Sequence, residues 1–498
     1  MTLPGNLDRF VLLFTLAISL SLSIRAQERP VLIKNATIID GTGRRAFDGD
    51  VLVKKGRIAR IGNIKISKNY DVVDATGKVL APGFIDIHNH SSFGLLSEGT
   101  AANQVSQGIT TVVIGPDGGS PFPLPDYFDS IDGSVAVNVA AFIGHATVRQ
   151  LVLKTDYMRK ATPQEVMQMA ALVRRSMKDG AFGLSTGLEY DVGFSASTDE
   201  IIELAKAAAK FDGIYMTHMR DEEEGMLDAL REAVRIGRQA RLPVQISHIK
   251  MGNRNVWGKS PDAIALIEAE RLKGLDITAD AYPYTAWAST ITVLVPSRRH
   301  TDRDEIAKGL RNVGGADKVL VTSCDAHRDY EGRTLEDIAA SKNTSPVDVY
   351  IEIVKNGGAG VVCNSMNETD VRNFYTRSWV MVSSDGGIGS RHPRGTGTFT
   401  RVLSRFVREN GWLEIEEAVR KMSSMPAARL QITDRGLIRK RMKADLVLFD
   451  KEKVIDNATF SHPQQLSSGV DLVLVNGIIV WEKGKATGKL PGQILRKR

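Results

Sequence analysis

Histidines in this chain stand directly after short apolar stretches more often than chance placement would give. Nine histidines occur among 498 residues, and five of them fall at such positions. One aspartate in the C-terminal half has the same placement, which gives the set His88, His90, His145, His218, His248 and Asp385. Imidazole and carboxylate ligands at this density suit Zn²⁺ or a similar divalent ion. We therefore expect a site for one or two zinc ions.

The triplet His88-Asn89-His90 is the most chelating element of this set. In an extended strand, side chains two residues apart point to the same side, so both imidazoles can reach one ion. A single histidine is more often a hydrogen-bonded core or surface residue. The joint occurrence with His218, His248 and Asp385 favours the metal site over that reading.

The apolar stretches that end at these residues alternate with stretches of helical length. This rhythm is typical of parallel βα units, and eight such units predict an α/β fold, a (β/α)8 TIM barrel. In such a barrel, catalytic groups lie at the C-terminal ends of the strands. We expect the barrel over residues 83–430, with an insertion at about 287–376 before the last strand. The expected strands end in the segments 83–88, 111–115, 137–144, 181–185, 214–218, 244–248, 277–280 and 380–385.

Both chain ends have a different pattern, in which short β-type runs are separated by glycine turns. Runs of this kind fill residues 31–77 and recur at 444–450 and 471–482, where Asn476-Gly477 is a hairpin signal. We expect one small β-sandwich built from residues 27–82 and 431–498.

The N-terminus has the features of a signal peptide over residues 1–26. Arg9 precedes an apolar run from Phe10 to Ile24, and a small residue, Ala26, stands at the expected cleavage point. About 15 apolar residues are fewer than the ~20 that span a bilayer, which disfavours an uncleaved membrane anchor. We expect a mature protein that begins near Gln27, is exported to the periplasm or secreted, and is not bound to a membrane.

Composition narrows the chemistry further. The net charge of +7 is spread over the whole chain, and acidic clusters such as 221–224 interrupt the basic ones, so a nucleic-acid partner is not expected. Two cysteines, Cys324 and Cys363, are too few for a disulfide framework or a cysteine zinc module. Any metal must use other ligands.

The ordered motifs of the chain resemble the amidohydrolase superfamily and, within it, the N-acyl-D-amino-acid deacylase (D-aminoacylase) family. The resemblance implies a metal-dependent hydrolase of the TIM-barrel type, flanked by a β-sandwich, that hydrolyses the amide of N-acylated D-amino acids, a small-molecule substrate. The motifs that carry it are residues 81–90, 144–149, 183–190, 217–220, 247–250, 281–284, 384–386 and 392–395.

One position departs from that family. Where relatives place a metal-binding cysteine after strand two, this chain has Asp117. Glu189 lies where superfamily relatives often carry a bridging carboxylate, usually a carboxylated lysine, and we favour Glu189 as the bridge. Two other readings stay open: Asp117 is a turn residue before Gly118-Gly119, and Glu189 caps an element or pairs with an arginine of the substrate loop.

The resemblance implies a role for each remaining candidate. His218, His248 and a carboxylate would hold one metal, with His88 and His90 on a second or weaker site. The metal would activate water, and Asp385 would carry the proton from that water to the leaving amine.

The free carboxylate of an N-acyl amino acid needs cations and hydroxyl groups. The resemblance implies His145, Lys250, Tyr282 and Arg394 as substrate-binding residues, and Arg and Tyr are suited to bind a carboxylate. The alternatives are that Lys250 is an exposed lysine at a strand end and that Arg394 shapes its glycine-rich loop.

Two other functions stay open from the sequence. The same metal site can hydrolyse cyclic amides or isoaspartyl dipeptides. A non-catalytic binding protein on a degenerate barrel is less favoured, because the candidate ligands of strands one, five, six and eight are all present.

Overall fold

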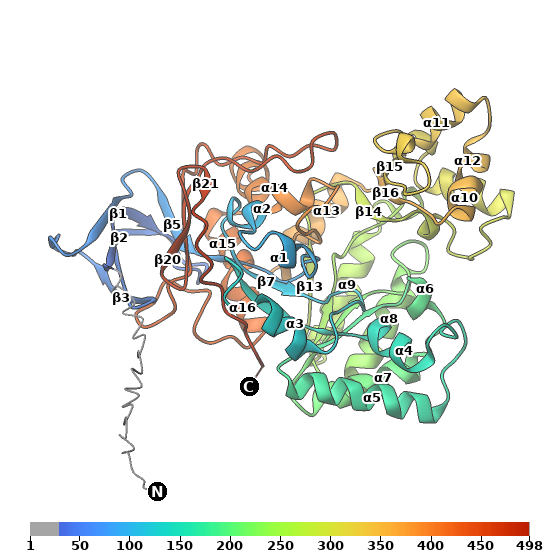
Figure 1. The fold of residues 1–498 in the computed structure, drawn as a ribbon, viewed down its shortest axis with the longest axis horizontal. Helices are drawn as coiled ribbons and strands as arrows, with labels where there is room; N and C mark the ends of the chain where they lie inside the picture. The colour runs from blue at the N-terminus through green and yellow to red at the C-terminus, as the bar shows by residue number, and fades with distance from the viewer. Residues whose placement is uncertain (1–28, 498) are drawn as a thin grey trace, which may run out of the picture.

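The structure, a computed structural model, describes residues 29–497 (Figure 1). The expected signal peptide, residues 1–26, lies outside the described residues. Among residues 29–497, no helix is both long enough and apolar enough to cross a membrane.

A parallel barrel forms the centre of the molecule, which confirms the predicted fold class. Its third strand is interrupted at Phe142 and so counts as two segments. The strands are β6 (Phe84–Asp86), β7 (Ile109–Ile114), β8 (Asn138–Ala141) with β9 (Ile143–Gly144), β10 (Gly183–Gly187), β11 (Ile214–His218), β12 (Val244–Ile246), β13 (Ile277–Ala281) and β17 (Val380–Val382).

The barrel closes between its first and last strands, beside the predicted ligands. The two parallel sheets have the orders β6-β7-β8 and β9-β10-β11-β12-β13-β17. An isolated bridge pairs Asn89 with Gly386, and the amide of Asp385 donates to the carbonyl oxygen of His88 at 3.0 Å. The chain therefore brings residues almost 300 positions apart to one edge.

The residues of these strands are almost all buried, and most of them are apolar or small, because both faces of each strand are covered. Side chains from opposite sides of the barrel, including Ile85, Val113, Met216 and Met381, share one buried apolar cluster that fills the interior. Helices cover the outer face; the main ones are α3 (Leu124–Ile131), α4 (His145–Leu153), α5 (Pro163–Lys178), α7 (Thr198–Ala209), α8 (Met226–Ala240), α9 (Ser260–Leu272), α13 (Glu368–Tyr375), α14 (Arg394–Arg401), α15 (Ile415–Met422) and α16 (Ser424–Arg429).

Both chain ends build one β-rich domain, seen on the left of Figure 1. Its nine strands share one hydrogen-bonded network, in which β5 (Val79–Pro82) pairs with β18 (Leu446–Phe449). The predicted hairpin at Asn476-Gly477 is confirmed, since Val475 pairs with Ile478 and both turn residues have positive φ. The other strands are β1 (Val31–Ile38), β2 (Phe47–Lys54), β3 (Arg57–Gly62), β4 (Asp71–Asp74), β19 (Val470–Val475), β20 (Ile478–Glu482) and β21 (Lys485–Ala486).

Between β13 and β17 the chain leaves the barrel and forms a small separate sheet. Its antiparallel order is β14 (Trp287–Thr290), β16 (Gly360–Cys363), β15 (Val319–Ser323). With α10 (Arg303–Asn312), α11 (Leu335–Lys342) and α12 (Pro346–Lys355), it projects at the top right of Figure 1.

A buried polar network joins the β-rich domain to the barrel. Asp445 forms an ion pair with Arg435, and both side chains are at least 97% buried. The same carboxylate accepts from the side chain of Asn138 on barrel strand β8 at 3.1 Å and from the amide of Asn476 at 2.6 Å. Three separate segments therefore depend on one buried carboxylate.

Asp445→Ala should lower the free energy of unfolding by about 3–5 kcal/mol, because it leaves the Arg435 charge buried without its partner. Urea unfolding followed by circular dichroism measures the change. Asp71→Ala is the matched control, since Asp71 is half exposed and pairs at 3.0 Å with Arg29, outside the network; it should change the value by less than about 0.5 kcal/mol. Equal effects of the two variants would contradict the role of the network.

Candidate active site

The predicted ligands from strands one, two, six and eight meet at the barrel mouth. The Nε2 atoms of His88 and His90 lie 3.3 Å apart. Asp117 Oδ2 lies 3.2 Å from His88 Nε2 and 3.5 Å from His248 Nε2. Asp385 Oδ1 lies 3.1 Å from His90 Nε2. Ligand atoms of His88, Asp117, His248 and Asp385 are all mutually close enough to share one ion.

A second group adjoins the first and shares His248 with it. His218 Nδ1 and His248 Nε2 are 3.0 Å apart, and Glu222 completes the group. Glu189 Oε2 lies 2.7 Å from the other ring nitrogen of His218. Two ion-sized groups of ligands therefore lie side by side.

Asp117 contacts more of these imidazoles than Glu189 does, including the shared His248. Its carboxylate lies within 3.5 Å of His88, His90 and His248, whereas Glu189 contacts His218 alone among these imidazoles. This geometry favours Asp117 over Glu189, the residue that the sequence favoured, as the bridging carboxylate. Asp117 is also a turn residue, as the alternative reading expected, and the turn is what aims its side chain inward.

The backbone is strained at several of these ligands. Asp117, His248 and Asp385 have φ values of 54°, 33° and 48°, a region that non-glycine residues rarely occupy. Strained backbone of this kind persists where the surrounding structure holds it, and it clusters at functional sites.

Buried hydrogen bonds hold these turns. The Ser185 hydroxyl accepts from the amide of Gly118, next to Asp117, and donates to the carbonyl of Gly115. Asp280 accepts the amide of His248 at 2.9 Å. Asp86 does the same for Ser384, the residue before Asp385.

The donor set fits a divalent metal ion. Within the described chain, Asp117 Oδ1 is buried and has no hydrogen-bond partner. A ring nitrogen of His88 lies 3.3 Å from one of His90, and a ring nitrogen of His218 lies 3.0 Å from one of His248. Two ring nitrogens this close to each other can bind one cation through their lone pairs. Zinc accepts imidazole and carboxylate ligands together.

A buried ion pair lies beneath the second group. Lys250 Nζ is 2.5 Å from Glu222 Oε2 and 2.7 Å from His248 Nδ1. Burial alone would lower the pKa of Lys250, but the charge of Glu222 raises it, so the ammonium keeps its proton. Lys250 is 4% exposed, which excludes the reading of an exposed strand-end lysine. The sequence reasoning missed Glu222, although its spacing of four residues from His218 was a usable signal.

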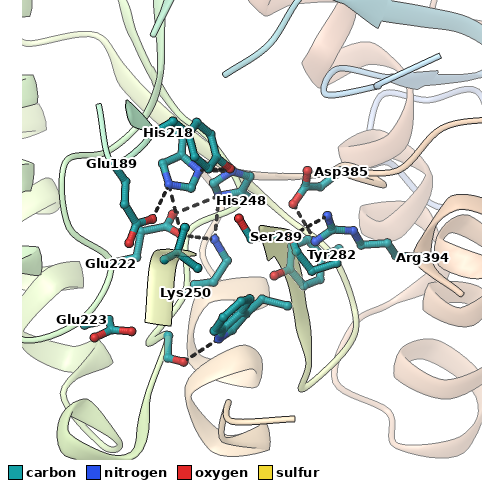
Figure 2. A pocket seen from close by; sticks show the side chains of 15 residues that line it. Glu189, His218, Glu222, Glu223, His248, Lys250, Tyr282, Ser289, Asp385 and Arg394 are labelled. Atoms are coloured by element: carbon teal, nitrogen blue, oxygen red, sulfur yellow. Dashed lines mark hydrogen bonds and ion pairs between the residues drawn. The ribbon is translucent and has the colours of Figure 1, made fainter. Parts of the chain in front are cut away.

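The opposite side of the pocket carries the second cation. Arg394 Nη1 lies 2.7 Å from Asp385 Oδ2, and its guanidinium stacks over the Tyr282 ring at 4.8 Å (Figure 2). Within the described chain its Nε is buried without a hydrogen-bond partner. Burial raises the pKa of Tyr282 to about 12 although Lys250 and Arg394 oppose the rise, so this side chain remains a hydroxyl donor.

The segment that leaves the barrel supplies part of the pocket wall. Trp287, Ser289 and Val293 line it, together with Tyr190 and Glu223 from the loops after strands four and five. Burial, with the charges of Glu189 and Asp221, raises the pKa of Glu223 to about 8. The sequence reasoning missed these lining residues. Only Tyr190 could have been proposed from the sequence, because it directly follows the candidate ligand Glu189.

His145 does not reach this pocket, which corrects its expected substrate-binding role. It is the first residue of α4 and is fully buried. Its Nε2 lies 2.9 Å from a carboxylate oxygen of Glu200 on α7, which also pairs with Arg149. Its imidazole therefore contacts the buried carboxylate of Glu200 and does not line the pocket.

Comparison with known proteins identifies relatives over almost the whole chain. A profile described as "Amidohydrolase family" matches residues 71–375 and 375–481. A D-aminoacylase of Alcaligenes xylosoxydans xylosoxydans is 36% identical, with 95% of this chain and 98% of the relative covered. An N-acyl-D-aspartate deacylase of the same organism is 35% identical, with 93% and 94% covered.

The fold is also similar to that of a solved relative. The crystal structure of N-acyl-D-glutamate deacylase from Bordetella bronchiseptica, complexed with zinc and a phosphonate inhibitor that mimics the tetrahedral intermediate, superposes with a TM-score of 0.85. The two sequences are 33% identical, and the match covers 94% of this chain and 99% of that one.

The two candidate bridging carboxylates should differ in their effect on metal binding. We expect Asp117→Ala to lose most bound metal, because this carboxylate contacts His88, His90 and the shared His248. Glu189→Ala should retain it, with at most a 10–100-fold weaker affinity, as expected for a neighbour of a single ligand. Metal per chain after dialysis, measured by elemental analysis on folded protein, decides between them. Loss of metal from Glu189→Ala alone would restore the preference for Glu189.

Proposed function

The chain belongs to the amidohydrolase family, and from this membership we propose that it hydrolyses the amide bond of N-acyl-D-amino acids, with a carboxylate and a free D-amino acid as products. The observation that carries the proposal is a histidine and carboxylate centre that opens onto a pocket with two buried cations.

The metal ligands are assigned by contact. His88, Asp117, His248 and Asp385, with His90 beside them, would hold one ion, and His218 and Glu222, which share His248 with the first group, would hold a second one. These residues would hold zinc, which when bound would supply the Lewis acidity that makes water nucleophilic near neutral pH.

Asp385 moves the proton. Burial alone would raise the pKa of Asp385, but Arg394 and His248 hold it well below its usual range, so the carboxylate is ionised at neutral pH. An ionised carboxylate beside the reacting amide can accept a proton from the attacking water and donate it to the leaving amine nitrogen.

Arg394, Tyr282 and Lys250 bind the free carboxylate of the substrate. The unpartnered Nε of Arg394 is a donor for it, and the Tyr282 hydroxyl adds a directional hydrogen bond. The Tyr190 hydroxyl, 3.2 Å from His218 Nδ1, is placed to donate to the oxygen of the acyl carbonyl.

Turnover of N-acetyl-D-amino acids and their L-enantiomers by zinc-loaded protein tests the proposal, with free amine as the readout. We expect turnover of D-substrates at least about 100-fold above that of L-substrates. A preference for cyclic amides or isoaspartyl dipeptides in the same panel would replace the proposal with the alternative amidohydrolase activity.

Asp385→Asn is the control for the mechanism in this panel. It keeps the size of the side chain but removes its basicity, so kcat should fall by several orders of magnitude while metal content stays nearly intact. Near-normal turnover would move the proton transfer to another group, with Glu189 the next candidate.

We also propose that the protein is exported, from the apolar run between Phe10 and Ile24 and the small residue Ala26 after it. N-terminal sequencing of protein expressed with its full leader should begin near Gln27. A mature chain that still contains Phe10–Ile24 would contradict export with cleavage.

A further inference from the structure

The distribution of charge around the pocket bears on the amino-acid side chain that it accepts. We propose that the enzyme selects N-acyl-D-amino acids with cationic or neutral side chains and rejects acidic ones, with Glu223 as the residue that sets this preference. The inference rests on the proposed function, because it concerns the substrate of the same site.

One wall of the pocket is acidic. Glu189, Glu222 and Glu223 lie together on one side, whereas Tyr282, Asp385 and Arg394 lie on the opposite side (Figure 2). Glu222 is neutralised by Lys250, and Glu189 contacts His218. Among the described residues, Glu223 has one side-chain partner, the neutral amide of Asn253 at 2.7 Å. It is therefore the carboxylate of this wall that no cation compensates.

The cations near the pocket are already engaged. Lys250 pairs with Glu222 and Arg394 pairs with Asp385. Arg298, from the segment after β14, pairs with Asp191 at 2.9 Å and donates to the carbonyl of Glu189. Once Arg394 and Tyr282 bind the α-carboxylate, no uncompensated cation in the described pocket remains for a second carboxylate.

The rest of the lining suits a long side chain with a polar end. Trp287 and Val293 supply apolar surface beside Glu223. The methylene stem of a lysine side chain contacts such surface while its ammonium reaches a carboxylate. Burial and the neighbouring carboxylates of Glu189 and Asp221 raise the pKa of Glu223, and an ammonium placed beside these three groups would favour its ionised form, whereas an acidic side chain would add to the repulsion.

Two relatives are named for acidic substrates, which differ from the cationic or neutral substrates proposed for this chain. An N-acyl-D-aspartate deacylase and an N-acyl-D-glutamate deacylase resemble this chain at 35% and 33% identity, and a D-aminoacylase does so at 36%. Identity at this level does not separate the three, so the choice depends on the residues that line the pocket.

The experiment compares kcat/KM of the zinc-loaded protein for N-acetyl-D-lysine, N-acetyl-D-methionine and N-acetyl-D-glutamate. We expect the lysine and methionine derivatives to exceed the glutamate derivative by at least about 100-fold, since like-charge juxtaposition costs several kcal/mol. A value for the glutamate derivative equal to or above the other two would overturn the inference. Absence of turnover for all three would instead contradict the proposed function.

Glu223→Gln assigns the preference to this residue. It keeps the hydrogen-bonding shape but cannot ionise beside an ammonium, so the ratio of kcat/KM for the lysine over the methionine derivative should fall about tenfold. The change should occur mainly in KM. Glu224→Gln is the matched control, because the neighbouring Glu224 is exposed and contacts Asn255 outside the pocket; its ratio should equal that of the unmodified protein. Equal ratios for Glu223→Gln and Glu224→Gln would remove Glu223 from the explanation.

Discussion

The site depends on backbone turns that non-glycine residues rarely adopt. Three candidate ligands, Asp117, His248 and Asp385, have positive φ at the ends of strands two, six and eight. Each such residue costs on the order of 1–3 kcal/mol, so the surroundings must offset the strain. At these turns, buried backbone amides donate hydrogen bonds to the hydroxyl of Ser185 and to the carboxylates of Asp280 and Asp86. The polar layer beneath the mouth thus explains how the ligands stay aimed inward.

Strand one is fixed at both of its ends, and this explains how distant parts of the chain share one site. Before the strand, the amide of Gly83 donates to the carbonyl of Asp445 in the β-rich domain. After it, His88 and His90 hydrogen-bond through their backbone to the last strand. The β-rich domain therefore does more than cover the barrel. It fixes the starting point of the strand that carries the two-histidine motif.

Periodicity along the sequence predicted the barrel. The contacts of individual site residues could not be predicted, because they depend on partners that are distant in the sequence. Apolar runs that alternate with helical stretches placed all eight barrel strands, and the histidines and the aspartate that follow some of these runs gave most of the ligands. The sequence favoured Glu189 as the bridge, whereas the geometry favours Asp117, because contacts with strand four that no local pattern shows hold the backbone turn at Asp117. His145 was misplaced because Glu200, 55 residues away, attracts its imidazole. Trp287 and Ser289 lie near the start of the segment that leaves the barrel, and the sequence alone did not show that this part of the segment lines the pocket.

The residues proposed for the reaction and those proposed for substrate selectivity come from different parts of the fold. The candidate ligands stand on barrel strands or directly after them, where buried hydrogen bonds hold them. Trp287, Ser289 and Val293 come from the segment that leaves the barrel, and Glu223 comes from a loop. Loops on a rigid scaffold can change without disturbing the strand ends. A barrel of this kind can therefore keep its metal ligands while the pocket changes the charge that it accepts, which is why relatives with different amino-acid preferences can share one fold and one centre.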